Sequence, residues 1–172
     1  MASRDSVITA GIRLLRQVAG RALASPSTSR RVPAAQTDAG YPGDYTQRPH
    51  IVYDPYDDDL PDPGEVIWAW VPYEEDHTQG KDRPALVIGR DGQWLLVLHV
   101  TSQDHDRDAD QEARVGRYWV DIGTGEWDRR RRPSEARVNR IIRIDPGQVR
   151  RIGAVLDRDH FDAVARAVLQ HY

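Results

Sequence analysis

Residues 84–100 read PALVIGRDGQWLLVLHV, in which two apolar runs, 84–88 and 94–100, flank the polar residues 90–93. Short runs of aliphatic and β-branched residues are typical of buried strands. Asp-Gly at 91–92 is a strong hairpin signal, because the common two-residue turns need positive φ angles that these residues tolerate. The stretch therefore predicts a β-hairpin whose two strands are largely buried.

The sequence around this hairpin adds further strand signals and one helix. Residues 65–71 are β-branched and aromatic until Pro72. Asp159 is a candidate N-cap for a helix that continues to Leu169 with its apolar side chains on one side. Shorter apolar or alternating runs are found at 118–122, 137–144 and 152–156. Five to six short strands and a closing helix predict a mainly β (α+β) domain over residues 64–172, built as a small curled antiparallel sheet or barrel.

The first 63 residues have a different composition. Residues 1–24 place isoleucines, leucines and valines on one helical face and arginines on the opposite face, which predicts an amphipathic helix. Such a helix is typical of segments that lie on an anionic membrane surface or dock on a partner, and also of leaders or helices that cover their own domain. Residues 25–63 are rich in Pro, Gly and Asp, and this composition predicts a largely disordered linker.

Charge is distributed in three blocks that the net charge of −3 conceals. Residues 1–32 carry six arginines and one acid, residues 38–76 carry eleven acids and one arginine, and residues 129–151 carry nine arginines and two acids. Such an uneven distribution of charge bears on which partners a protein binds and not on which fold it adopts. One hypothesis is that the acidic residues 38–62 lie across a basic groove and mimic RNA or a protein partner. The arginines at 129–132 suit phosphate contacts or, equally, a solvated loop.

Composition and spacing exclude several kinds of chemistry. The chain of 172 residues has no cysteine, which rules out disulfides, thiolate metal sites and a cysteine nucleophile. The acidic run at 104–110 fails the EF-hand pattern, because Gln111 and Arg117 stand where Gly and Glu are required. No two histidines have the spacing of a helical metal pair, so we expect neither a metal nor a cofactor. Arginines interrupt the only candidate apolar segment, so we expect a soluble, cytoplasmic protein.

One arginine and one hydroxyl have positions that suit phosphate chemistry. Arg83 precedes the first strand of the hairpin, and Thr101 follows the second. Because the start of one hairpin strand neighbours the end of its partner, both side chains are expected at the same rim of the sheet. A guanidinium beside a hydroxyl there suits the stabilisation of a pentavalent phosphorane, although a structural surface arginine is the other interpretation.

These residues also carry a resemblance to a known family. Gly64-Glu65-Val66, then Gln79-Gly80-Lys81-Asp82-Arg83-Pro84 with the strand to Ile88, and Val100-Thr101-Ser102 resemble the PemK/MazF toxins of bacterial toxin–antitoxin systems. The resemblance covers about residues 64–172. It implies an SH3-like barrel, usually a homodimer, that cleaves single-stranded RNA without metal by attack of the ribose 2′-hydroxyl on the adjacent phosphate.

By position, the resemblance implies that Arg83 and Thr101 are catalytic, with Arg83 serving proton transfer and charge stabilisation, and that Gln79, Gly80, Lys81 and Ser102 bind substrate. It also implies an antitoxin that inserts a peptide into the RNA groove, and binding of promoter DNA by the toxin–antitoxin complex. Glu74, Glu75 and Asp76 precede Arg83, and their charge opposes a phosphodiester. The alternative function is therefore a non-catalytic RNA- or DNA-binding regulatory module, and a third is a membrane-surface adaptor that uses residues 1–24.

Overall fold

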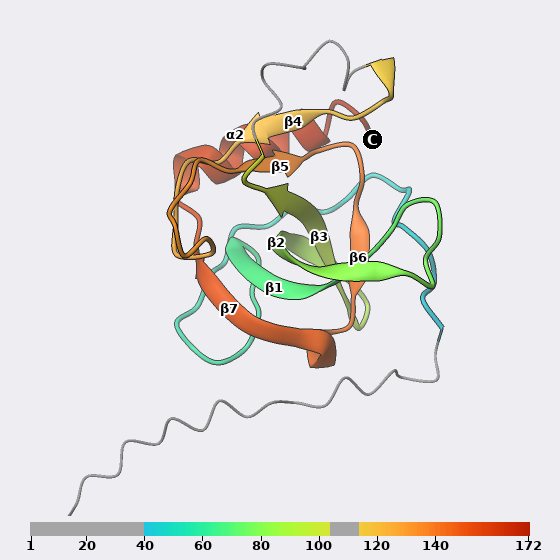
Figure 1. Ribbon diagram of the computed structural model, residues 1–172, viewed down its shortest axis with the longest axis horizontal. Helices are drawn as coiled ribbons and strands as arrows, with labels where there is room; N and C mark the ends of the chain where they lie inside the picture. Colours follow the sequence, from blue (N-terminus) through green and yellow to red (C-terminus); the bar gives the residue numbers. More distant parts are fainter. Residues whose placement is uncertain (1–39, 104–113) are drawn as a thin grey trace, which may run out of the picture. The chain divides into compact units, whose positions relative to one another are not determined.

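A computed structural model of the chain describes residues 40–103 and 114–172 (Figure 1). The predicted amphipathic helix at 1–24, the first part of the predicted linker and the acidic run at 104–110 lie outside the described residues. Within the described part of the chain, no helix is both long enough and apolar enough to cross a membrane.

The described strands form one antiparallel sheet with a helix at the carboxyl end of the chain (Figure 1). Strands β1 (Glu65–Pro72), β2 (Gly80–Asp91) and β3 (Trp94–Thr101) make an antiparallel meander. The order across the sheet is β4–β5–β3–β2–β1–β7, and β6 pairs with β3 outside this path. The remaining elements are β4 (Trp119–Asp121), β5 (Glu135–Arg137), β6 (Ile142–Ile144), the 3-10 turn η2 (Pro146–Gln148), β7 (Val149–Val155) and α2 (Arg158–Val168).

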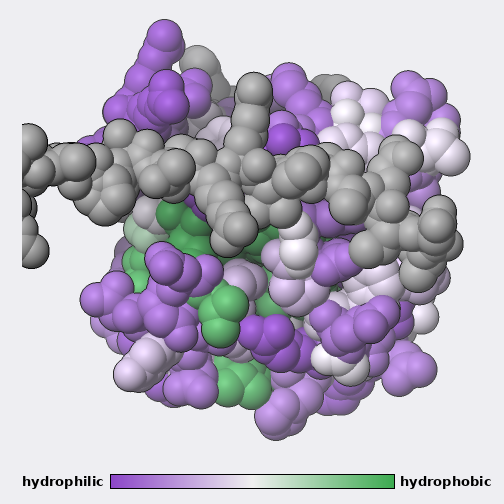
Figure 2. Space-filling model, turned by 90° about the horizontal axis from the view of Figure 1, so that it is seen from below, coloured by the Kyte–Doolittle hydropathy of each residue, from purple (hydrophilic) through white to green (hydrophobic). Residues whose placement is uncertain are grey.

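The mainly β architecture with a closing helix is confirmed, but the described sheet has seven strands rather than five to six and is not closed into a barrel. The outer strands β4 and β7 do not pair with each other in the described part of the chain. Figure 2 views the molecule from below Figure 1, and hydrophobic residues gather in one part of that face. On edge strand β7, Val149 and Ile152 pack against the core while Val155 is half exposed.

Both faces of the central hairpin are buried, which explains its uninterrupted apolar sequence. Alternate residues such as Leu96 and Leu98 face a cluster that includes Phe161 and Val164 of α2. The residues between them, such as Leu95 and Val97, face a second cluster formed within the curl of the sheet. Each large side chain that is fully buried in this way contributes about 1.5–3 kcal/mol relative to an exposed position.

The alternating run at 137–144 is not the single strand that the sequence predicts, because β5 ends at Arg137 and β6 begins at Ile142. β5 pairs with the end of β3 at Val100 and Thr101, whereas β6 pairs with the middle of β3. Between them the chain turns, and Val138 and Ile141 remain buried within the turn. The alternation of apolar and polar residues continues through the turn between β5 and β6, because the turn itself packs into the core. The pattern therefore does not show where one strand ends and the next begins.

The helix α2 begins close to the predicted position but has a different cap. The carboxylate of Asp157, and not that of Asp159, accepts a hydrogen bond from the backbone N–H of His160 at 3.1 Å. Asp159 lies in the first turn, where a negative charge interacts favourably with the helix dipole.

Residues 40–63, called the strap below, differ from the disordered linker that their composition predicts. The backbone of Tyr45 bridges Ile141, and the N–H of Val52 donates to the carbonyl of Ile88 at 3.0 Å. The strap also passes so close to β2 that a Cβ on Gly89 would lie 2.5 Å from the carbonyl oxygen of His50. Tyr45, Ile51 and Tyr53 supply apolar contacts to the first core cluster, so the strap packs as part of the domain.

Candidate active site

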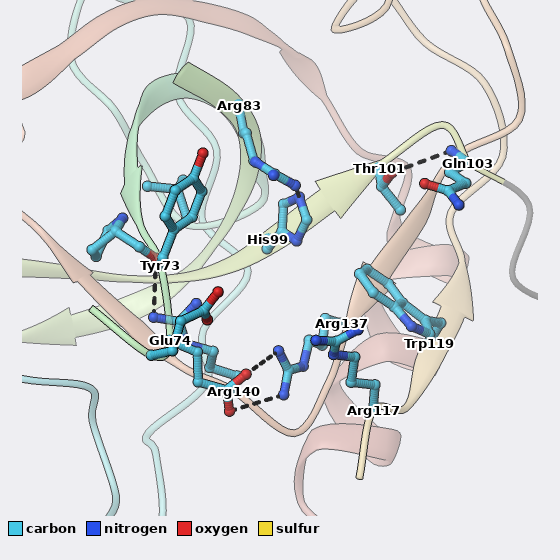
Figure 3. Close-up of a pocket in the computed structure, with 13 residues that line it drawn as sticks. Tyr73, Glu74, Arg83, His99, Thr101, Gln103, Arg117, Trp119, Arg137 and Arg140 are labelled. Carbon is cyan, nitrogen blue, oxygen red and sulfur yellow. Dashed lines mark hydrogen bonds and ion pairs between the residues drawn. The ribbon is translucent and has the colours of Figure 1, made fainter. Parts of the chain in front are cut away.

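The predicted catalytic residues Arg83 and Thr101 line one pocket at the end of the β2–β3 hairpin (Figure 3). The pocket has a volume of about 360 Å³. Four arginines, Arg83, Arg117, Arg137 and Arg140, line it together with Glu74 and Glu75. The lining is therefore predominantly cationic, and it suits an anionic ligand.

Arg83 is held at the pocket by its position in β2 and by a histidine of β3. Its backbone lies opposite Ala69 of β1, and its Nη1 lies 2.9 Å from Nε2 of His99. A guanidinium only donates hydrogen bonds, so Nε2 of His99 accepts and the imidazole in this contact is neutral. Arg83 thus keeps an uncompensated positive charge in this contact. Figure 3 shows the two side chains pointing toward each other.

Thr101 is the last residue of β3 and lines the pocket beyond His99. Its Oγ1 accepts a hydrogen bond from the backbone N–H of Gln103 at 3.2 Å. In Figure 3 it projects from the same strand as His99 but lies farther from Arg83. The fold therefore brings Arg83 and Thr101 to one pocket, while the hydrogen bond of Arg83 runs to His99.

The opposite side of the pocket carries an ion pair. Arg137, which is 7% exposed, donates from Nη1 and Nη2 to the carboxylate of Glu74 at 2.7 and 3.1 Å. The hydrogen bond from Arg137 lowers the pKa of Glu74 more than partial burial raises it. Glu74 is therefore an anion that occupies the guanidinium fork of Arg137.

Arg140 connects the strap to the pocket. Its guanidinium donates to Asp44 at 2.7 and 3.2 Å and to the carbonyl oxygen of Pro72 at 3.1 Å. Among the described residues that line the pocket, none lies in the strap. The hypothesis that the acidic stretch shields a basic groove therefore has one supporting contact, through Asp44, and it stays a prediction.

The four predicted substrate-binding residues lie near the pocket but are not among its lining residues. The amide of Gln79 donates to Asp76 at 2.7 Å and so orders the loop before β2. Gly80 opens β2 where a Cβ would lie 2.5 Å from the indole of Trp70. Lys81 is exposed opposite Val71, and Ser102 follows β3 half buried.

The arginine run at 129–132 is partly neutralised by neighbouring acids. Arg132 donates to Asp128 at 2.6 Å, and this contact lowers the pKa of Asp128 to about 2. Arg131 pairs with Glu126 at 2.8 Å. No residue of the run is among those that line the pocket, so the structure does not connect the run to Arg83.

Several pocket residues were not identified from the sequence. His99 is the most informative, because its ring contacts both Arg83 and the edge of Trp119, with ring centroids 5.6 Å apart in the second contact. Its position two residues before Thr101 on the same strand is the signal that indicates it, since residues i and i+2 share a face. No comparable pattern identifies Arg137, because its pairing with Glu74 spans 63 positions.

Metal ligation has no visible basis in the described residues. Across residues 40–103 and 114–172, no three His, Asp or Glu side chains converge as a metal ion would require. The chemistry of the described pocket is that of guanidinium, imidazole, hydroxyl and carboxylate groups.

The fold and the pocket define a small antiparallel-sheet protein with an arginine-lined site at the end of its central hairpin. Residues 62–172 match the family model described as PemK-like, MazF-like toxin of type II toxin–antitoxin system. The match spans more than half of the 172 residues, so the chain belongs to this family and the resemblance is confirmed. No curated protein matches the sequence significantly.

Proposed function

We propose that the protein is a metal-independent endoribonuclease of the PemK/MazF toxin type, which cleaves single-stranded RNA by attack of a ribose 2′-hydroxyl on the adjacent phosphate. The observation that carries the proposal is Arg83, whose charge is directed into a cationic pocket by a neutral hydrogen-bond partner. Membership of the toxin family supports the same assignment.

In this mechanism Arg83 binds the non-bridging oxygens of the scissile phosphate and stabilises the charge that accumulates on the phosphorane. Thr101 offers a hydroxyl at the same pocket as a further hydrogen-bond donor to those oxygens. Arg117 extends the positive lining toward a neighbouring phosphate, and Trp119 offers a face on which an unpaired base can stack. The loop residues Gln79, Gly80 and Lys81, together with Ser102, flank the bound strand.

The proposed partners follow from the family and from the charge of the pocket. A cognate antitoxin would cover the arginine-lined pocket with an acidic segment, and the resulting complex would bind promoter DNA. The toxin would act in the cytoplasm as a homodimer, with RNA as its substrate.

The alternative is a non-catalytic nucleic-acid-binding module on the same fold. One specific observation favours it: Glu74 occupies the fork of Arg137, and Glu75 adds a second carboxylate to the pocket lining. These carboxylates repel a phosphodiester and reduce the number of arginines that are available to it.

Incubation of the purified full-length chain with single-stranded RNA in EDTA distinguishes the two functions. Cleavage that leaves 2′,3′-cyclic phosphate ends and is lost in Arg83→Ala is the result expected of the enzyme. Intact RNA with salt-sensitive binding would instead establish the module. Circular dichroism of the variant confirms that it is folded.

A further inference from the structure

The pocket contains one imidazole that the proposed mechanism has not used. His99 is half buried in β3, paired with Ala85 of β2 in the strand register and two residues before Thr101. Its Nε2 is fixed 2.9 Å from Nη1 of Arg83, and its ring meets Trp119 of β4 edge-on. Side chains of β2 and β4 therefore contact the ring, and Nε2 is directed at the residue proposed to bind phosphate (Figure 3).

Transfer of a 2′-hydroxyl to phosphorus requires a base that accepts its proton. A guanidinium remains protonated at all relevant pH values, so Arg83 can take part in proton transfer only as a donor, and a threonine hydroxyl is too weak a base to accept the proton. Two carboxylates, Glu74 and Glu75, are among the described lining residues, and a carboxylate, with an ordinary pKa of about 4.3, is a weaker base than imidazole. The hydrogen bond from Arg137 lowers the pKa of Glu74 further and weakens it more as a base. Histidine has the side chain whose ordinary pKa, about 6.5, suits proton transfer near neutrality.

The contact with Arg83 also fixes which nitrogen of His99 carries the lone pair. Because Arg83 is the donor, Nε2 is the acceptor and the ring proton resides on Nδ1. A phosphate that binds Arg83 draws Nη1 toward its own oxygens and leaves the lone pair of Nε2 directed at the bound nucleotide. The resting hydrogen bond thus keeps the base in the tautomer that the reaction requires.

We propose that His99 is the general base of the reaction, an assignment that rests on the proposed function. The 2′-hydroxyl proton passes to Nε2 of His99 while the O2′–P bond forms and the P–O5′ bond breaks. The departing 5′-oxygen takes a proton from solvent water, and the imidazolium returns its proton to solvent. The products are a 2′,3′-cyclic phosphate and a 5′-hydroxyl, and no other reactant is consumed.

The charged groups around His99 come from several elements. Arg83 of β2, Arg117 before β4, Arg137 of β5 and Arg140 after it contribute positive charge, and Glu74 and Glu75 of the β1–β2 loop contribute negative charge. Two of these arginines have carboxylate partners, because Arg137 pairs with Glu74 and Arg140 pairs with Asp44 of the strap.

Four forms of the full-length chain test the assignment: wild type, Arg83→Ala, His99→Gln and His99→Ala. The glutamine places an acceptor near the position of Nε2, so it keeps a partner for Arg83 but takes up no proton. The measurements are kcat/KM for cleavage of a single-stranded RNA in EDTA from pH 5 to 8.5, and the Kd for its uncleavable 2′-O-methyl form.

In wild type we expect kcat/KM to rise about tenfold per pH unit at acid pH and then to level off, as the imidazole loses its proton. In His99→Gln we expect kcat/KM to fall at least about 100-fold and to lose this acid limb, with Kd changed by less than about threefold. Imidazole added to His99→Ala should restore part of the rate and should not restore Arg83→Ala.

Wild-type kcat/KM and an unchanged pH profile in His99→Gln would overturn the assignment and leave the endoribonuclease intact, because His99 would then serve Arg83 only as an acceptor. If wild type itself left the RNA uncut, the proposed function would be overturned, and the assignment of His99 as general base would be overturned with it. The two failures are therefore distinguished by the activity of wild type.

Discussion

The two sides of the pocket use arginine differently. On the β2–β3 side, Arg83 is half buried and its partner is the imidazole of His99, which accepts a hydrogen bond without contributing negative charge. On the β5 side, Arg137 is almost fully buried and donates two hydrogen bonds to the carboxylate of Glu74. The first arrangement leaves a cation available to a ligand, and the second neutralises it.

We propose that this difference separates a ligand-binding arginine, Arg83, from a structural one, Arg137. A neutral acceptor orients a guanidinium at little cost to its attraction for phosphate, whereas a carboxylate competes directly with phosphate for the same fork. The Arg137–Glu74 pair also joins β5 to the β1–β2 loop, so it contributes to the shape of the pocket. Substitutions on the two sides should therefore affect different measurements.

Arg83→Ala tests the first side and has the largest expected effect. Loss of the charge that stabilises the phosphorane should lower kcat for RNA cleavage by about 10²–10³-fold. Thermal unfolding should change little, because the side chain is half exposed and His99 can exchange its partner for water. A large loss of stability without a selective loss of cleavage would contradict the contrast between the two arginines.

Arg137→Ala tests the second side and should act mainly on stability. The substitution removes a buried guanidinium and its packing, but it leaves a carboxylate that is half exposed and can be hydrated. We expect the free energy of unfolding to fall by about 1–3 kcal/mol, measured by urea denaturation. Arg117→Ala, at an exposed position in the same pocket, is the matched control, and an equal loss there would refute the structural role.

Glu74→Gln makes the second side resemble the first by giving Arg137 a neutral partner. We expect the affinity for uncleavable single-stranded RNA to rise by about threefold to tenfold, because repulsion is removed and the charge of the guanidinium is no longer compensated by a carboxylate. The gain should diminish as salt is raised. Glu75→Gln is the control, since within residues 40–103 and 114–172 no hydrogen bond joins Glu75 to an arginine. A larger gain in Glu75→Gln would contradict the assignment of Glu74 as the carboxylate that competes with RNA.

The pH dependence of stability gives the smallest effect. The hydrogen bond from Arg137 lowers the pKa of Glu74 in the folded state below its ordinary value of 4.5. The stabilisation is therefore complete above pH 4.5 and is lost as the pH falls through the lower folded-state pKa. Urea denaturation should show wild type more stable than Glu74→Gln at pH 6, with the difference vanishing in acid. If the difference in the free energy of unfolding between wild type and Glu74→Gln grew as the pH fell, the lowered pKa of Glu74 would be contradicted.

The strap shows where composition misleads about structure. Proline, glycine and aspartate dominate residues 40–63 and predict disorder, yet Tyr53 packs edge-on against Phe161 and donates to the carbonyl of Leu156 at 2.9 Å. Composition averages over a segment, whereas a few apolar side chains at suitable positions are sufficient to hold it. The residues that these side chains contact are about a hundred positions away along the chain, so a local sequence pattern does not predict the contacts.

The sequence by itself determined the central hairpin, the closing helix, the family, and the placement of Arg83 and Thr101 toward the same end of the hairpin. These features depend on short-range periodicity, on turn chemistry and on a motif of contiguous residues. Only the tertiary structure decided that β5 and β6 are separate strands and that the strap packs against the core. It also decided that His99 is the hydrogen-bond partner of Arg83 and that Glu74 occupies the guanidinium fork of Arg137. Each of those outcomes depends on which side chains the curled sheet brings together, and hydrogen bonding and charge neutralisation act through space without regard to separation along the chain.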